Sequence, residues 1–503
     1  MKKTIILSII INLITWLLIP IEFFLFNIPR LVGVLFAILA IAADIFYLVK
    51  SNSKKSAKII QTIISIYTAL TILFFAICFP YWNSIVFKKH VNTITKPFDY
   101  EMTQKQALHD FDYAYKQLNR VHPAMLNKKG DEYKKVQAAY ETERNKICGK
   151  EKTTVVELQQ HVERFLSVLQ DGHTYTRAYY GEPRYMKYLD QVNDEDFSFT
   201  ALNGIPYDEL LQQKKDLFSF ESEILAKQDL GDYSIYYQYL IYLGYDLDKG
   251  ITYTLEKTDD AGNKITKELT VTKDDFLPFD EYKEYNKKYR EKKNADSGTE
   301  KKSFCYYTIE PEHNVAVFTL TDCTNNAEYK NCLKNMFTEV KEKGIGNVAV
   351  DVRNNGGGSS LVINSFIKYL DTDGFYEPTY SFRLGPFLLK DGNGYVKNNR
   401  HDELLFTGNV YVLTNIKSFS SAMMYPQIIK DNGLGKVIGQ APGNDPNGYG
   451  DVVHFFMPTS RLFMQVSYKK FHRVNQNTTE KWIEPDFPCE SKDVFEVLYS
   501  MTK

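Results

Sequence analysis

Three long apolar stretches open the chain, at Ile5 to Ile28, Leu31 to Val49 and Ile59 to Phe79. With a rise of about 1.5 Å per residue, each is long enough to span a hydrocarbon core of about 30 Å. A secretory signal would supply one such run and a small-residue cleavage site, and no such site follows the first run. The pattern therefore predicts three transmembrane helices that form a membrane anchor over residues 1–90 and remain attached.

The basic residues around these stretches predict an orientation. Lys2 and Lys3 precede the first stretch, and four lysines fill the loop before the third. Because cytoplasmic loops collect Lys and Arg, the amino terminus and this loop are predicted inside, and everything after Trp82 outside. Lys88 and Lys89 oppose this assignment. We expect an integral protein of the cell membrane whose larger part is extracytoplasmic and whose anchor contacts membrane lipid.

The remaining chain divides by periodicity. Apolar positions recur at three- and four-residue steps between residues 103 and 169, which predicts a helical module over residues 91–182. Residues 183–300 are less regular: a strand at Phe197–Leu202 and a helix at Tyr207–Gln213 precede a hairpin that pairs Ile251–Lys257 with Ile265–Val271. The charged segment Lys283–Lys302 reads as a linker or an exposed helix.

Strands and helices alternate after Phe304. Strands are predicted at Val315–Leu320, Val348–Val352 and Val410–Thr414, each followed by a helical pattern. This alternation predicts an α/β unit over residues 301–503 with a parallel or mixed sheet covered by helices. Reactive groups on such sheets gather at the carboxyl ends of the strands.

Charge and cysteine content narrow the function. The first ninety residues carry nine Lys and Arg against two acidic residues, and the other 413 carry 52 basic against 60 acidic. A net acidic larger part disfavours nucleic-acid binding, which requires a basic face. The six cysteines show no CxxC or Cys/His spacing that would hold zinc, so no metal site is predicted.

A glycine-rich segment follows the strand that ends near Val352. It runs from Asp351 through Gly356, Gly357 and Gly358 to Ser360, where a helix begins. Glycines let backbone N–H groups turn outward, and a helix amino end favours negative charge. A phosphate-binding P-loop would need GxxxxGK[ST], which is absent, so an oxyanion site is favoured over a phosphate site, with a purely structural turn as the alternative.

Two further segments carry reactive side chains. The cluster Lys417-Ser418-Phe419-Ser420-Ser421-Ala422 lies where a strand gives way to a helix, so a serine hydroxyl there can face a cleft while the next N–H stabilises an oxyanion. Serines are also ordinary helix caps. His173 follows Asp171-Gly172 at a helix–strand turn and could serve as a base of near-neutral pKa, although a lone histidine is usually structural.

Together these motifs resemble the tail-specific (carboxy-terminal processing) serine proteases. Asp171-Gly172-His173-Thr174, the Asp351–Ser360 segment, the Ser418–Ala422 cluster and the closing Trp482-Ile483-Glu484-Pro485-Asp486 occur in the family's order, and the likeness covers roughly Thr103 to Pro488. The resemblance implies a Clp protease/crotonase-like ββα spiral core and peptide-bond hydrolysis. It also implies a degenerate PDZ-like insert within residues 183–300.

The resemblance also implies site residues. Ser420 falls on the family nucleophile, but Asp445 stands where the Ser-Lys branch carries its lysine. This departure indicates the tricorn-like branch, in which a histidine matching His173 is the base and a late glutamate assists. Glu480 is the first candidate for that glutamate and Glu484 the second. Gly172 replaces the polar helper of tricorn-type enzymes.

We therefore expect a membrane-anchored serine endopeptidase that cleaves polypeptide substrates outside the cytoplasm. His173 would take the proton of Ser420, and backbone N–H groups of Gly356, Gly357, Gly358 and Ser421 would hold the oxyanion. No metal or organic cofactor is required. Because the lysine is missing, a catalytically inactive relative that binds peptides or lipids is the alternative, and an esterase using the same groups is the third reading.

Overall fold

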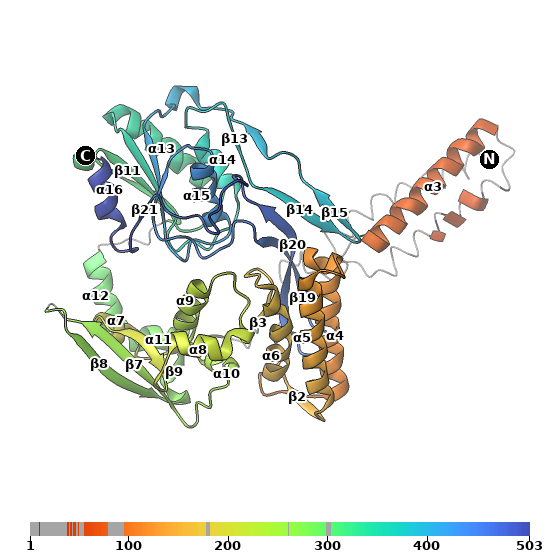
Figure 1. Cartoon of the computed structure of the whole chain (residues 1–503), viewed down its shortest axis with the longest axis horizontal. Coiled ribbons are helices and arrows are strands. Elements are labelled where there is room, and N and C mark those ends of the chain that lie inside the picture. The colour runs from red at the N-terminus through yellow and green to blue at the C-terminus, as the bar shows by residue number, and fades with distance from the viewer. Residues whose placement is uncertain are drawn as a thin grey trace.

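The computed structural model describes residues 95–177, 182–259, 261–297 and 303–502, helix α3 (Lys55–Cys78), and residues 10, 38–39, 41–42, 44–46 and 49. Helix α3 projects away from the rest of the chain (Figure 1). Of the helices in these described parts, none is both long and apolar enough to cross a membrane. The first predicted span lies outside the described residues except for residue 10, and the second is described only at residues 38–39, 41–42, 44–46 and 49.

The carboxy-terminal third is built on a six-stranded sheet, which confirms the predicted α/β class. Its strand order is β10-β11-β12-β17-β18-β21, and all neighbours are parallel except the β10–β11 pair. The strands are β10 (Cys305–Glu310), β11 (Val315–Leu320), β12 (Asn347–Asp351), β17 (Asn409–Thr414), β18 (Lys436–Gly439) and β21 (Phe487–Pro488). The central strand β12 is buried at every position, as expected of a strand covered on both faces.

Helices cover both faces of this sheet. On one face, α13 (Ala327–Lys343), α14 (Leu361–Ile367) and α15 (Ser421–Asp431) share a large apolar core with the strands. On the other face, α16 (Val494–Thr502) packs its Val494 and Leu498 against β11, β12 and β17. Both α14 and α15 begin just after the carboxyl end of a parallel strand, so their starts lie at the same edge of the sheet.

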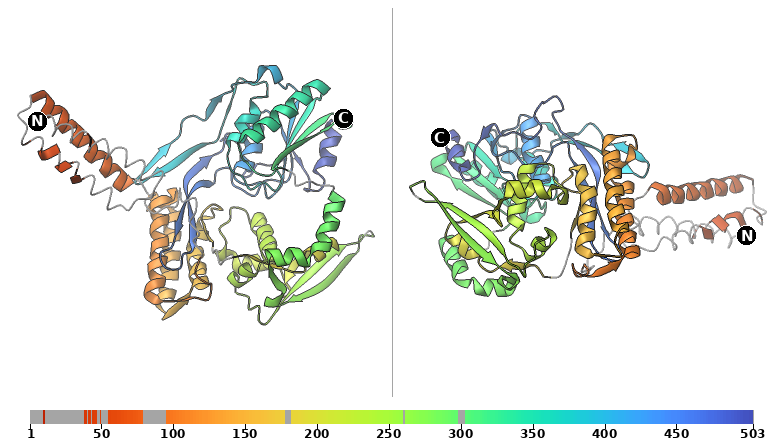
Figure 2. Two further views of the ribbon diagram at one scale, coloured as in Figure 1. Left: turned by 180° about the vertical axis from the view of Figure 1, so that it is seen from behind. Right: turned by 60° about the horizontal axis from the view of Figure 1, so that its bottom comes forward.

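A second sheet connects the helical module to this core. Its order is β15-β14-β20-β19, and β3 (Tyr175–Arg177) pairs with β20. The strands are β14 (Thr379–Leu384), β15 (Phe387–Lys390), β19 (Tyr449–Phe456) and β20 (Phe463–His472). Helices α4 (Gln104–Val121), α5 (Asp131–Cys148) and α6 (Val155–Leu166) share one apolar cluster with β19 and β20, and they stand beside these strands in Figure 2. Segments about 300 residues apart in the sequence thus form one core.

Residues 182–297 form a separate apolar cluster. Its sheet, β6-β5-β7-β8, pairs β5 (Ser198–Leu202) with β6 (Ile205–Pro206) and β7 (Ile251–Thr258), and β7 with β8 (Lys264–Val271). Helices α8 (Tyr207–Lys214), α9 (Glu223–Tyr233) and α10 (Tyr237–Tyr242) pack against it. The remaining elements are β4 (Arg184–Met186), α7 (Leu189–Asp194), β9 (Phe276–Pro278), α11 (Phe279–Tyr285) and α12 (Lys287–Ser297). The loop between α8 and α9 contacts the turn before β3 and the segment before β19.

Candidate active site

Ser420 occupies a strained turn between strand β17 and helix α15. Its backbone dihedrals are φ 55° and ψ −123°, a conformation that residues with a side chain rarely adopt and that is concentrated at functional sites. The Ser420 N–H donates a 2.7 Å hydrogen bond to Asn444 Oδ1. The preceding residues also fix the turn, since the buried Ser418 hydroxyl donates to the Val352 carbonyl and the Phe419 N–H to the Asn355 carbonyl. The strain is therefore held by surrounding contacts.

The glycine loop lies directly against this turn. Gly357 has φ 103°, and a β-carbon added there would lie 2.7 Å from Ser420 Cβ and 3.0 Å from Ser421 N. Only glycine fits this position. The Ser421 hydroxyl donates to the Gly358 carbonyl at 2.8 Å and ties the start of α15 to the loop. The structure thus brings the predicted glycine loop, Ser420 and Ser421 together.

The donors of the loop are not equivalent. The Gly357 N–H already donates to Asn355 Oδ1 within the loop, at 2.8 Å. Gly356 has open space around its α-carbon, whereas Gly358 is pressed against the Cys323 backbone. A backbone N–H that is engaged inside the loop is a poorer oxyanion donor than one that faces the nucleophile.

His173 is held at the turn between α6 and β3. Asp171 Oδ1 accepts the His173 N–H at 2.9 Å, and Gln465 of β20 donates to the His173 carbonyl at 2.8 Å. The side chain is 14% exposed, and its ring lies 4.7 Å from the Phe419 ring at a tilt of 30°. Since Phe419 immediately precedes Ser420, this ring contact places the imidazole beside the nucleophile turn.

The carboxylate of Glu221 lies closer to His173 Nδ1 than that of Asp171, and the sequence alone did not point to it. Its Oε1 lies 3.7 Å from His173 Nδ1 and accepts the Gly172 N–H at 3.3 Å. It comes from the loop between α8 and α9, in Phe218-Ser219-Phe220-Glu221-Ser222, where the only sequence signal was a single acid in an aromatic stretch. Nothing in that segment resembles a catalytic motif.

A continuous network joins Glu221 to the nucleophile. Glu221 Oε2 accepts hydrogen bonds from the Asn444 side-chain amide and from the Asp445 N–H. Asn444 in turn accepts the Ser420 N–H. The segment in which the family lysine is missing therefore uses Asn444 and the backbone of Asp445 to hold a carboxylate from the insert.

The two glutamates predicted to assist the histidine, Glu480 and Glu484, contact basic residues instead. Glu480 contacts Lys430 at 3.0 Å and Arg473 at 2.9 Å, and Arg473 also pairs with Asp431. The carbonyl of Glu484 accepts from the same Lys430. The described contacts of His173 include Glu221 and Asp171 and neither of these two residues.

The charges around His173 set its protonation. Burial alone would lower the pKa of His173, but the Glu221 carboxylate, with Asp171 and Asp451, outweighs burial and raises it. Burial would likewise raise the pKa of Asp171, but a hydrogen bond from His122 and the charges of His122 and His173 lower it to about 2. Asp171 is thus a permanent anion behind the histidine.

The two ring nitrogens of His173 have different surroundings. Nδ1 faces both carboxylates, so Nε2 is the nitrogen left for a reacting group. Neither nitrogen has a hydrogen-bond partner among the described residues, the Ser420 hydroxyl included. Serine–base hydrogen bonds are often long without substrate and tighten when it binds.

Asp171, His173 and Glu221 also offer one ligand atom each within 4.8 Å of one another. These are donor types that bind zinc. Both carboxylates, however, already accept hydrogen bonds from the surrounding chain, namely from His173 N–H and Thr174 to Asp171, and from Gly172 and Asn444 to Glu221. The surrounding chain therefore orients both carboxylates beside the His173 ring.

Comparison with known proteins supports a protease-like core. Residues 314–489 match the family model described as Peptidase family S41. A structure of a CPAF mutant aligns with TM-score 0.55 and 12% identity over 79% of this chain and 95% of that one; mature CPAF gives 0.54 and 11%, with the same coverage. At this identity the likeness concerns the fold alone. No curated protein sequence matches the chain significantly.

Proposed function

We propose that this chain is a serine-type peptidase of the tail-specific kind that hydrolyses peptide bonds through Ser420 and His173, because residues 314–489 match the family model described as Peptidase family S41. The observation that carries the proposal is the network that runs from Ser420 through Asn444 to Glu221, beside His173 Nδ1. It gathers a nucleophile, a base and an orienting carboxylate from three distant segments. Such a constellation is recognised by its geometry and not by its sequence order.

In the proposed mechanism, His173 Nε2 accepts the proton of Ser420 as the serine oxygen attacks the scissile carbonyl. The oxyanion then lies between the start of α15 and the glycine loop, where the Ser421 N–H and the N–H groups of Gly356 and Gly358 supply the donors. Collapse of this intermediate transfers the proton from His173 to the leaving amine. Water then releases the acyl group with the same base.

Glu221 takes the orienting role in this proposal. Its position at Nδ1 favours the tautomer with a proton on Nδ1 and a free lone pair on Nε2, and it stabilises the imidazolium that forms during attack. Glu480, in contrast, neutralises Lys430 and Arg473. The insert would thereby contribute directly to catalysis by an enzyme that lacks the lysine base.

Activity-based labelling tests the proposal. The full-length chain should react with a fluorophosphonate probe and cleave a peptide library, and Ser420→Ala should abolish both. Ser500→Ala is the control for labelling, because Ser500 is an exposed serine of α16 whose hydroxyl donates to a carbonyl of its own helix. An unlabelled wild-type chain that still binds peptides would favour the inactive relative, and turnover confined to an ester panel would favour the esterase.

We also propose that the amino-terminal segment attaches the enzyme to the cell membrane, with the catalytic part outside the cytoplasm. The three apolar stretches and the flanking lysines support this, as do the exposed isoleucines of α3, for example Ile60 and Ile63 at 59% and 60% exposure. A cysteine placed at Lys330 in a chain without native cysteines should react with a membrane-impermeant thiol reagent in intact cells. Protection in intact cells with reaction after lysis would reverse the orientation.

A further inference from the structure

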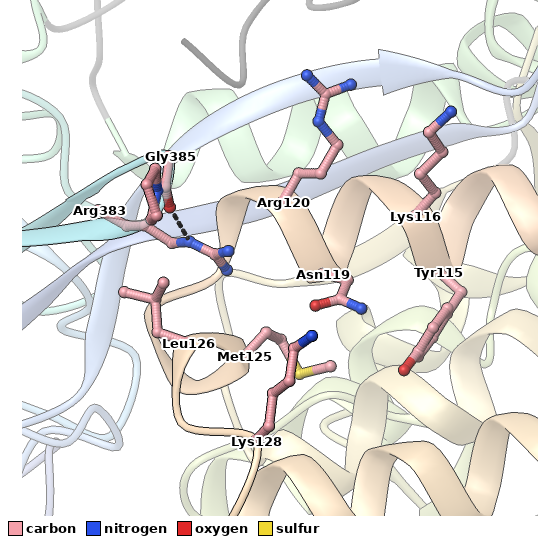
Figure 3. Close-up of a pocket in the computed structure, with 10 residues that line it drawn as sticks. Tyr115, Lys116, Asn119, Arg120, Met125, Leu126, Lys128, Arg383 and Gly385 are labelled. Atoms are coloured by element: carbon pink, nitrogen blue, oxygen red, sulfur yellow. Dashed lines mark hydrogen bonds between the residues drawn. The ribbon is translucent and has the colours of Figure 1, made fainter. Parts of the chain in front are cut away.

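A basic cavity lies away from the proposed active site, between helix α4, the turn η3 (Pro123–Leu126) and strand β14. Its volume is about 710 Å³, and its lining includes four cationic residues and no acidic one (Figure 3). The cations are Lys116, Arg120, Lys128 and Arg383. A concave site lined by positive charges favours an anionic ligand, because its low-dielectric walls strengthen the electrostatic attraction.

Arg383 is the buried centre of this charge. It is 7% exposed, and its guanidinium donates to two backbone carbonyls, from Nε to Gly385 at 2.9 Å and from Nη1 to His122 at 2.7 Å. None of the carboxylates in the described part of the chain forms an ion pair with it. Burial, followed by the charge of Arg120, lowers the pKa of Arg383 to about 10. A buried cation without an anionic partner is costly, and a bound anion would offset that cost.

Two other polar groups face the same space. In Figure 3 the Arg383 guanidinium extends from the left and the Lys128 ammonium from below toward the Asn119 side-chain amide. Several cations that approach from different directions suit a phosphate group better than a carboxylate, because phosphate carries more charge and more acceptor oxygens.

The cavity is much larger than a phosphate ion, and part of its wall is apolar. Met125, Leu126 and Pro386 complete the lining. The adjoining strand β15 exposes Phe387, Leu388 and Leu389 by 52%, 48% and 41%, so an apolar surface continues beyond Pro386. The ligand that fits these walls joins a phosphate to an apolar organic group.

We propose that this cavity binds an organic phosphate, with Arg383 and Lys128 on the phosphate and the Met125–Pro386 wall on its organic part. Two sources share this chemistry, a phospholipid headgroup and a soluble phosphate ester. The proposal does not depend on the peptidase mechanism, because no residue of the cavity belongs to the Ser420–Glu221 network.

Calorimetric titration of the full-length chain in nonionic detergent tests the proposal. The probes are inorganic phosphate, glycerol 3-phosphate, monomeric dihexanoyl phosphatidic acid and, as the lipid control, dihexanoyl phosphatidylcholine. We expect saturable binding of at least one phosphate monoester, and at least tenfold weaker binding to the Lys116→Gln/Lys128→Gln variant. Tighter binding of the lipid than of glycerol 3-phosphate would assign the site to a headgroup, and equal binding would assign it to a soluble ester.

Both lysines are exposed, so the double variant should fold, which a change at the buried Arg383 does not guarantee. Lys105→Gln/Lys330→Gln removes the same charge elsewhere on the surface and should bind as the wild type does. Absence of saturable binding by every phosphate probe up to about 10 mM would overturn the proposal. Equal losses in the two double variants would also overturn it, because they would reduce the effect to overall charge.

Discussion

Glu221 Oε1 lies 3.7 Å from His173 Nδ1, although Glu221 comes from the insert and His173 from the turn before β3. The same carboxylate accepts hydrogen bonds from the Asn444 side chain and the Asp445 N–H. One side chain thus connects the insert, the histidine turn and the segment that fixes Ser420. The surroundings of the His173 ring therefore depend on how the insert packs against the rest of the chain.

Replacing Glu221 by glutamine should lower kcat/KM by about a hundredfold or more, within the range of general acid–base effects. Because Glu221 raises the pKa of His173, its removal should also shift the acid limb of the kcat/KM profile to lower pH. A loss of packing alone would not move that limb. The pH dependence of peptide hydrolysis measures both effects.

Glu480→Gln is the matched comparison. Glu480 contacts Lys430 and Arg473, so its replacement should leave the acid limb where it is, whatever it does to stability. A shifted limb in Glu480→Gln together with an unshifted limb in Glu221→Gln would assign the orienting role to the later glutamate.

The glycine loop gives a second prediction. An alanine at Gly357 would be strained at φ 103° and would place its β-carbon 2.7 Å from Ser420 Cβ, so we expect a loss of about 1–3 kcal/mol in the free energy of unfolding and nearly complete loss of fluorophosphonate labelling. Gly356→Ala is the control, because no atom lies within 4 Å of its added β-carbon and its φ is not positive. Chemical denaturation and labelling rate distinguish the two variants, and equal behaviour would contradict the contact.

The sequence predicted those parts of the site that depend on local pattern. A strand and a helix flank the glycine run at Asp351–Ser360, and a strand and a helix also flank the serine cluster at Ser420, so both loops could be located from periodicity. Parallel neighbours β12 and β17 then place the two loops at the same sheet edge. The hairpin β7–β8 was likewise readable from alternation around a turn.

Glu221 was beyond such reasoning because its role is set by contacts across 49 positions to Gly172 and 223 positions to Asn444. A charged residue in an irregular loop looks like any solvated acid until the fold buries it beside a histidine. The positive φ of Ser420 was equally hidden, since serine rarely adopts it. The basic cavity joins α4 to β14, which are far apart in the sequence, and no single charge run marked it.

The lowered pKa of Asp171 should make the folded protein less stable in acid. Its folded-state pKa of about 2 lies below the unfolded value, so its contribution is present above about pH 4 and is lost as the pH falls toward 2. Asp171→Asn should flatten that part of the stability profile and reduce stability at pH 7, because the hydrogen bonds from His122 and Thr174 are weakened. Asp131→Asn, at an exposed helix start, should not change the profile. Urea unfolding between pH 2 and 7 gives the comparison, and parallel profiles for wild type and Asp171→Asn would contradict it.

The buried carboxyl group of Glu163 should give the opposite pH dependence of folding stability near neutral pH. It is buried, and burial raises its pKa to about 7 despite hydrogen bonds from Ser219 and Thr176. A raised folded-state pKa means that its stabilising contribution is complete below about pH 4.5 and is lost as the pH rises through 7. Glutamine does not ionise, and its Oε1 can accept from Thr176 while its Nε2 donates to the Ser219 hydroxyl. The stability of Glu163→Gln relative to wild type should therefore increase between pH 5 and 8, by up to about 3 kcal/mol. Glu151→Gln, exposed at the start of β2 (Lys152–Thr154), should show no such trend.

Ser219 lies two residues before Glu221, so ionisation of Glu163 should also loosen the loop that holds Glu221. Hydrogen exchange of residues 218–222 should therefore become faster above pH 7 in the wild type but not in Glu163→Gln. Equal exchange in both proteins at pH 8 would sever this link between the buried acid and the orienting carboxylate.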